Sequence, residues 1–161
     1  MAALGSYAGC IGTYSYPANG HYLDQYANTG MFLFKNGRKL KQITDGTSST
    51  FATGEVRGED TENGWNAWAY AQRDISCLRN TVNPVNTLPG APFALPLADC
   101  TYASGNPPTP CWNAAFGSNH PGGANFTFVD GHVTFINDDI AITVYRALST
   151  IAGNEVVDRN F

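Results

Sequence analysis

The sequence predicts an α+β fold, because a β-hairpin and an amphipathic helix follow one another in a chain of domain size. The hairpin is expected at about residues 125–136, where apolar residues alternate on both sides of Asp130-Gly131. The helix is expected at about 139–152, where apolar residues recur at helical spacing. A chain of 161 residues can bury a sizeable core, and we expect 1–161 to form a single globular domain.

Shorter elements are predicted before the hairpin. Residues 4–16 are extended in character, residues 31–34 ("MFLF") predict a short strand, and residues 51–56 predict another. Asp45-Gly46 is a turn signal, after which Thr47 or Ser48 could cap a short helical turn. Residues 58–111 are irregular, contain most of the prolines, and indicate function or variable surface rather than regular structure.

The hairpin is predicted with Asp130-Gly131 as a two-residue turn, whose positive φ angles Gly adopts without strain. In this register Thr127 faces Thr134 across the strands. One face of the hairpin then carries four apolar side chains, which we expect to be buried under the helix: Phe126, Phe128, Val133 and Phe135.

The helix is predicted from its caps and its apolar stripe. Asp138 or Asp139 provides an N-cap, and Gly153 lies where a left-handed C-terminal residue is expected. The stripe that should pack on the hairpin consists of Ile140, Val144, Ala147, Leu148 and Ile151.

Composition and charge exclude some classes of function. Charged residues make up only 14% of the chain, the net charge is -4, and there is no basic run, so nucleic acid is not expected as a partner. No apolar run approaches the roughly 20 residues that span a membrane. The low charge and abundant Gly, Ser, Thr and Tyr are typical of secreted or assembled proteins.

Four cysteines suggest an oxidising compartment. Their even number and the absence of a Cys-x-x-Cys pair favour two disulfides over a zinc site. We predict Cys100–Cys111, which would close a Pro-rich loop, and Cys10–Cys77. The alternative is four buried free thiols.

Two groups of polar residues are candidates for chemistry. His120 and Asp130 could act as acid–base partners, but their separation along one strand favours a structural role. Asp130 would then make an Asx-type turn and His120 would bond a backbone carbonyl. Oxygen ligands for calcium are offered only weakly, by Asn137, Asp138 and Asp139, and helix capping explains the same residues. No cofactor, metal or catalytic residue is otherwise predicted.

Three blocks in order carry a family resemblance: "SYAGCIGT", "ITDGTSSTFATGEV" and "HPGGANFTFVDGHVTFI", the last leading into "VYRALSTIAGNEVV". Over about residues 5–157 the chain resembles the planctomycete-type prepilin-like family of unknown function. That family ends in an H-x9-DG box, which His120, Asp130 and Gly131 match here. The resemblance implies an α+β head of pilin or pseudopilin type, built on an antiparallel sheet. It also implies an N-terminal apolar helix, which we expect to be missing from this chain.

These observations predict a non-catalytic structural subunit, the soluble head of an exported pseudopilin-like protein. Its expected location is extracellular or periplasmic, tethered to the membrane through the missing helix or assembled in a filament. Its partners would be other pilin-like subunits or cell-surface proteins. The alternative is a binding module for a glycan or a protein partner that uses the aromatic segment 58–111. A hydrolase based on His120 and Asp130 is the third and least supported hypothesis.

Overall fold

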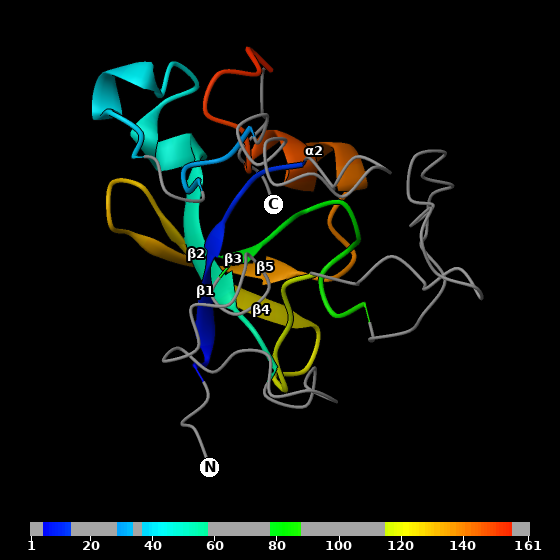
Figure 1. Ribbon diagram of the computed structural model, residues 1–161. Coiled ribbons are helices and arrows are strands. Elements are labelled where there is room, and N and C mark those ends of the chain that lie inside the picture. Colours follow the sequence, from blue (N-terminus) through cyan, green and yellow to red (C-terminus); the bar gives the residue numbers. More distant parts are fainter. Residues whose placement is uncertain (1–4, 14–28, 34–36, 58–77, 88–114, 156–161) are drawn as a thin grey trace, which may run out of the picture.

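A computed structural model of the chain describes residues 5–13, 29–33, 37–57, 78–87 and 115–155 (Figure 1). These residues form a five-stranded sheet and one short α-helix, which confirms the predicted α+β class. The strands are β1 (Tyr7–Cys10), β2 (Phe51–Glu55), β3 (Leu78–Arg79), β4 (Gly123–Phe128) and β5 (Val133–Asn137). The helix is α2 (Ile142–Ala147), and 3₁₀ turns lie at Leu40–Gln42 and Thr47–Ser49.

The sheet has the strand order β3-β1-β2-β4-β5. The pairs β1–β2, β2–β4 and β4–β5 are antiparallel, whereas β1 and β3 run parallel. The prediction of an antiparallel sheet is therefore wrong at β3, and the sheet is mixed. Parallel neighbours need a long connection, and the chain between β1 and β3 is long enough to provide it.

The predicted strand at 51–56 is confirmed as β2, but that at 31–34 is not. Residues 31–33 form no strand, and residue 34 lies outside the described part. The Phe32 N–H donates to the Cys10 carbonyl over 3.0 Å, and the Phe32 ring lies against the Cα of Gly9. The segment thus covers β1 without extending the sheet.

The hairpin formed by β4 and β5 has a register one residue away from the prediction. Thr127 pairs with Val133 and Phe126 with Thr134, so the predicted Thr127–Thr134 pair is not formed. The Gly131 N–H donates to the Phe128 carbonyl, which closes a loop of three residues instead of two. Gly131 has φ 94°, as expected for a turn that ends in a left-handed glycine.

The extra loop residue exchanges the two faces of β5. Phe126 and Phe128 are buried as predicted, but Val133 and Phe135 are exposed and Ile136 takes the core position. Because side chains alternate along a strand, a shift of one residue reverses the whole pattern. The prediction that Val133 and Phe135 are buried is therefore wrong.

The core lies on the face of the sheet that α2 covers (Figure 1). Phe51 stacks on Phe126 with ring centroids 4.4 Å apart, and Tyr145 of α2 meets both rings at 5.9 Å. Gly54 makes room for this cluster, since a Cβ there would lie 2.6 Å from the Phe126 ring and 2.7 Å from the Phe116 ring.

The helix packs on this face as predicted, but it is shorter than 139–152. Its N-cap is Ala141, because the Asp138 N–H donates to Gly122 and prolongs the β4–β5 ladder instead of starting a helix. At the other end Ser149 Oγ donates to the Arg146 carbonyl, and Asn154 rather than Gly153 has a positive φ, 59°.

The apolar stripe is confirmed in part. Leu148 and Ile151 are buried, while Ile140 and Val144 pack at the edge of the core. Tyr145, which was not predicted, is the fully buried residue of α2. Whether the whole of 1–161 forms one domain stays a prediction.

Candidate functional site

The two polar residues of the H-x9-DG pattern lie at opposite ends of β4. His120 precedes the strand and Asp130 follows it in the hairpin loop. A strand rises about 3.3 Å per residue, so the two side chains cannot share a substrate atom. The hypothesis of a His120–Asp130 acid–base pair is therefore wrong.

Asp130 organises the hairpin loop. Its Oδ1 accepts the His132 N–H over 3.1 Å and lies 2.6 Å from His132 Nδ1, which confirms the predicted Asx-type turn. The hydrogen bond from the His132 ring, and then that from the His132 backbone, lowers the pKa of the Asp130 carboxyl. The loop backbone is also anchored, since Val129 and Asp130 donate to the carbonyls of Thr50 and Thr47.

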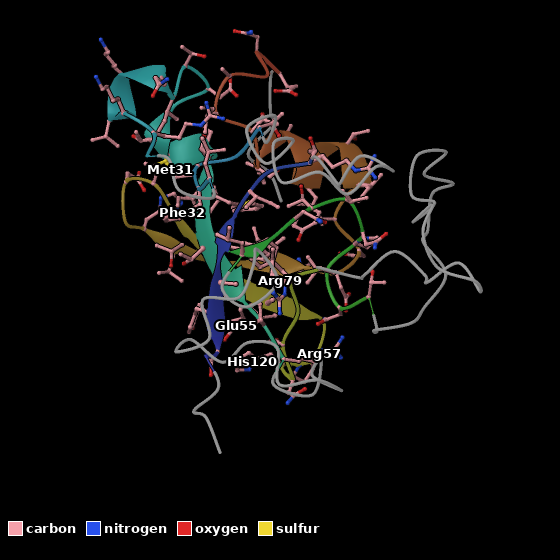
Figure 2. The ribbon with its side chains drawn as sticks, viewed as in Figure 1. Met31, Phe32, Glu55, Arg57, Arg79 and His120 are labelled. Carbon is pink, nitrogen blue, oxygen red and sulfur yellow. The ribbon has the colours of Figure 1, made fainter. Side chains whose placement is uncertain are left out.

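His120 contacts a side chain that sequence reasoning missed. Its Nε2 lies 3.3 Å from Oε1 of Glu55, the last residue of β2, and not against a backbone carbonyl as predicted. Figure 2 shows both residues near Arg57, at the end of the sheet away from Met31 and Phe32. The Glu55 side chain is 13% exposed and the His120 side chain 58%, so the carboxylate lies within the fold and the imidazole at its surface.

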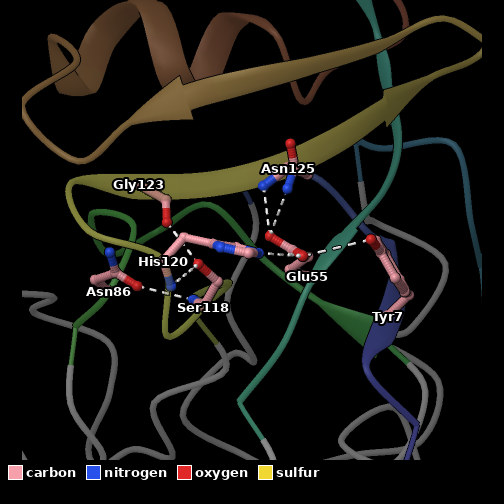
Figure 3. Close-up of polar contacts among 7 residues, drawn as sticks. All are labelled: Tyr7, Glu55, Asn86, Ser118, His120, Gly123 and Asn125. Atoms are coloured by element: carbon pink, nitrogen blue, oxygen red, sulfur yellow. Dashed lines mark hydrogen bonds and ion pairs between the residues drawn. The ribbon is translucent and has the colours of Figure 1, made fainter.

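Glu55 is the centre of this polar cluster (Figure 3). Its Oε2 accepts two hydrogen bonds from Asn125, from the backbone N–H over 2.7 Å and from Nδ2 over 3.2 Å. Its Oε1 accepts the Tyr7 hydroxyl over 3.4 Å and faces His120. The carboxylate thus joins β1, β2, β4 and the segment before β4, which we call the Glu55 cluster: Tyr7, Glu55, His120 and Asn125.

The segment that positions His120 is held by hydrogen bonds between side chains and the backbone. Ser118 Oγ accepts the His120 N–H over 3.0 Å and donates to the Gly123 carbonyl over 2.6 Å. Ser118 N–H donates in turn to Oδ1 of Asn86 over 2.9 Å (Figure 3). His120 is therefore placed by a closed turn rather than by a free loop.

The two glycines after Pro121 are both required by geometry. Gly122 has φ 80°, which L residues with a side chain rarely adopt. A Cβ on Gly123 would lie 2.1 Å from the Ile136 carbonyl oxygen, which is too close for any other residue. The sequence His-Pro-Gly-Gly is thus explained as the entry into β4.

The polar side chains around Glu55 are already used in contacts within the fold. Both oxygens of the carboxylate already have hydrogen-bonding partners, and Ser118 Oγ is committed to the Gly123 carbonyl. Partial desolvation, and then the charge of Glu55, raises the pKa of Tyr7, which favours the protonated hydroxyl that donates to Glu55. One signal pointed to Glu55: it is the single charged residue in the strand predicted at 51–56.

Cys10 is a free thiol in this structure and is completely buried in the core face of β1. Burial raises the pKa of this thiol to about 12. The predicted Cys10–Cys77 disulfide is thus not formed. Cys10 is instead a buried free thiol, as in the alternative interpretation. Cys77, Cys100 and Cys111 lie outside the described residues, so the Cys100–Cys111 bond stays a prediction.

The weak calcium candidates do not converge. Asn137 is the last residue of β5, and Asp138 Oδ2 accepts a hydrogen bond from Asn86 Nδ2 over 3.3 Å. Asn137, Asp138 and Asp139 are all exposed. In the described ranges no three His, Cys, Asp or Glu side chains come together as a metal-binding group. Calcium therefore has no support from the geometry of this segment.

The described residues thus combine an α+β fold with a polar cluster that makes hydrogen bonds between strands. The chain belongs to the family described as "Protein of unknown function (DUF1559)", whose model matches residues 2–143. This is the prepilin-like family that the three sequence blocks indicated. No curated protein and no solved structure matches the chain significantly. None of the helices in the described ranges is long and apolar enough to span a membrane.

Proposed function

We propose that the chain is a non-catalytic structural subunit, the globular head of an exported pilin-like protein. Membership of the prepilin-like family supports the pilin-like part of this proposal. The absence of catalysis is our inference from the way the polar groups of the cluster are used.

One observation carries the proposal: both polar residues of the H-x9-DG pattern fix the backbone of the same strand. His120 ties the start of β4 to Glu55 of β2, and Asp130 ties its end to His132. A reaction centre needs a nucleophile, a base and a place for the reacting atom within about 3 Å of one another. His120 instead contacts Glu55 of β2, and Asp130 contacts His132 of its own hairpin, so the two residues share no partner.

The location and partners follow from the same proposal. A pilin-like subunit would lie outside the cytoplasm, either tethered to the membrane or within a filament. It would contact other pilin-like subunits or cell-surface proteins, and it would need no cofactor.

The test uses the protein produced by its native host. Surface labelling of intact cells followed by chemical cross-linking should recover the protein in the envelope or the medium, in bands larger than a monomer. A monomer confined to the cytoplasm would contradict the proposal. Because His120 and Asp130 are architectural in this account, His120→Ala should lower the yield of folded protein without changing the fraction in which it is found.

The alternative is a binding module that uses segment 58–111. The structure describes only residues 78–87 of that segment, and most of them are buried, so they offer little surface. The rest of the segment lies outside the described residues. A glycan array probed with the chain tests this alternative, and a specific hit at sub-micromolar concentration would favour it.

A further inference from the structure

Strand β5 is an edge strand whose second side has no partner within the described ranges. The strand order ends at β5, which pairs with β4 alone. An edge strand presents a row of unpaired N–H and C=O groups, which is a template for another strand.

The groups that point away from β4 can be assigned from the ladder. His132 and Asp138 both bond toward β4, since Phe128 N–H donates to His132 and Asp138 N–H donates to Gly122, each over 2.9 Å. Residues alternate between the two sides of a strand, so the residues at 134 and 136 also bond toward β4. The outward N–H and C=O groups therefore belong to Val133, Phe135 and Asn137.

This edge lacks the features that usually prevent pairing. The strand sequence VTFIN contains no charge and no proline, and its ladder with β4 has no bulge. Its outer face carries apolar side chains instead: Val133 is 62% exposed and Phe135 is 38% exposed. The same residues thus offer free backbone groups and apolar surface together.

We propose that β5 pairs with β5 of a second copy of this chain, in antiparallel orientation, to form a continuous sheet across a two-fold axis. Full overlap of the strand with itself places the axis at Phe135, which then faces Phe135 of the second copy. Val133 faces Asn137 of the second copy, and all of these residues direct their free backbone groups toward the partner strand.

A polar contact at each end of β5 favours a second copy over an unrelated peptide. In this register His132 of one chain lies opposite Asp138 of the other, and the two-fold axis repeats the pair. Both residues are exposed and lie on the same face of the sheet. His132 directly precedes β5 and Asp138 directly follows it. The Nδ1 atom of His132 is held by Asp130 of its own chain, which leaves Nε2 to meet Asp138 of the other chain at both ends of the strand. The inference does not rest on the proposed function, since it concerns the isolated chain.

Sedimentation velocity of the 161-residue chain gives the first test. Raising the concentration from about 10 µM to about 1 mM should increase the average mass from the 17.3 kDa monomer toward twice that value. Phe135→Lys sets two like charges against each other across the axis and should keep the chain monomeric. Leu40→Lys is the matched control, because Leu40 is an exposed apolar residue outside the sheet, and it should sediment as the parent does.

Disulfide trapping gives a second test that does not depend on Phe135→Lys being folded. In a hydrogen-bonded antiparallel pair the Cα atoms lie about 5.5 Å apart, within the range of a disulfide. Phe135→Cys should therefore yield a dimer on mild oxidation, with a 135–135 cross-link in peptide mapping. Val133→Cys alone should not, because residue 133 faces residue 137. Three results would each overturn the proposal. The first is a parent chain that stays monomeric at about 1 mM. The others are a dimer that Phe135→Lys leaves unchanged, and equal disulfide trapping at residues 133 and 135.

Discussion

Strands β4 and β5 belong to one hairpin and have similar alternating patterns, yet they differ in burial. β4 buries Ala124, Phe126 and Phe128, whereas β5 buries Ile136 alone and exposes Val133 and Phe135. β4 lies between two strands over the aromatic core, while β5 is at the edge of the sheet. The alternation of apolar residues along an edge strand therefore does not show which of them are buried, because the length of the turn determines which face each side chain lies on.

The largest expected effect contrasts one aromatic residue of each strand. Phe126 is fully buried against Phe51, Phe116 and Tyr145, so Phe126→Ala should lower the free energy of unfolding by about 3–5 kcal/mol. Phe135→Ala should cost less than about 1 kcal/mol, because the ring is already partly in water. Urea unfolding of both variants at low protein concentration measures the difference. Equal losses of unfolding free energy in the two variants would mean that Phe135 lies in the core, as in the register with a two-residue turn.

The loop that separates the two strands gives the next effect. Gly131 has φ 94° with open space around its Cα, so Gly131→Val strains the backbone without a clash and should cost about 1–3 kcal/mol. Gly37 is the matched control, since it is exposed with open space around its Cα and no positive φ. Gly37→Val should change the melting temperature little. A neutral Gly131→Val would mean that the three-residue loop is wrong.

A third effect concerns Cys10 of β1, which lies in the same core as the aromatic residues. The Cys10 thiol has a pKa of about 12, above its usual value of 9.0, because burial disfavours the thiolate. Above pH 9 the unfolded chain releases the thiol proton while the folded chain keeps it, so the free energy of unfolding falls as the pH rises toward 12. We expect this loss to reach about 1 kcal/mol by pH 10. Urea unfolding between pH 7 and pH 10 should therefore show a steeper loss for the parent than for Cys10→Ala. Parallel pH profiles would place the thiol in contact with water.

Much of the fold could be predicted because its signals are local. The alternation around Asp130-Gly131 located the hairpin, and the apolar stripe at Leu148 and Ile151 located the helix that covers it. The register could not be predicted, because Asp-Gly is compatible with loops of two or three residues. The helix start was also missed, since the contact between Asp138 and Gly122 joins residues that no local pattern connects.

The candidate site was predicted only in part, for the same reason. Asp130 bonds to a residue two positions away, and its role was visible in the sequence. His120 contacts Glu55, whose position beside it depends on the pairing of β2 with β4. A single sequence does not reveal such a contact, although an isolated carboxylate in a strand with few charges is a signal to look for a partner.

Double-mutant cycles test the central claim most directly, namely that His120 and Asp130 are separate supports of β4 rather than one reactive pair. Unfolding free energies are measured for His120→Ala, Glu55→Gln and Asp130→Ala, and for the doubles that combine His120→Ala with each of the other two. We predict a coupling of about 0.5–1 kcal/mol between His120 and Glu55, as for partly exposed ion pairs. The effects of His120→Ala and Asp130→Ala should add to within about 0.5 kcal/mol, because the two residues lie at opposite ends of the strand. A coupling above that limit between His120 and Asp130, with none between His120 and Glu55, would contradict the account.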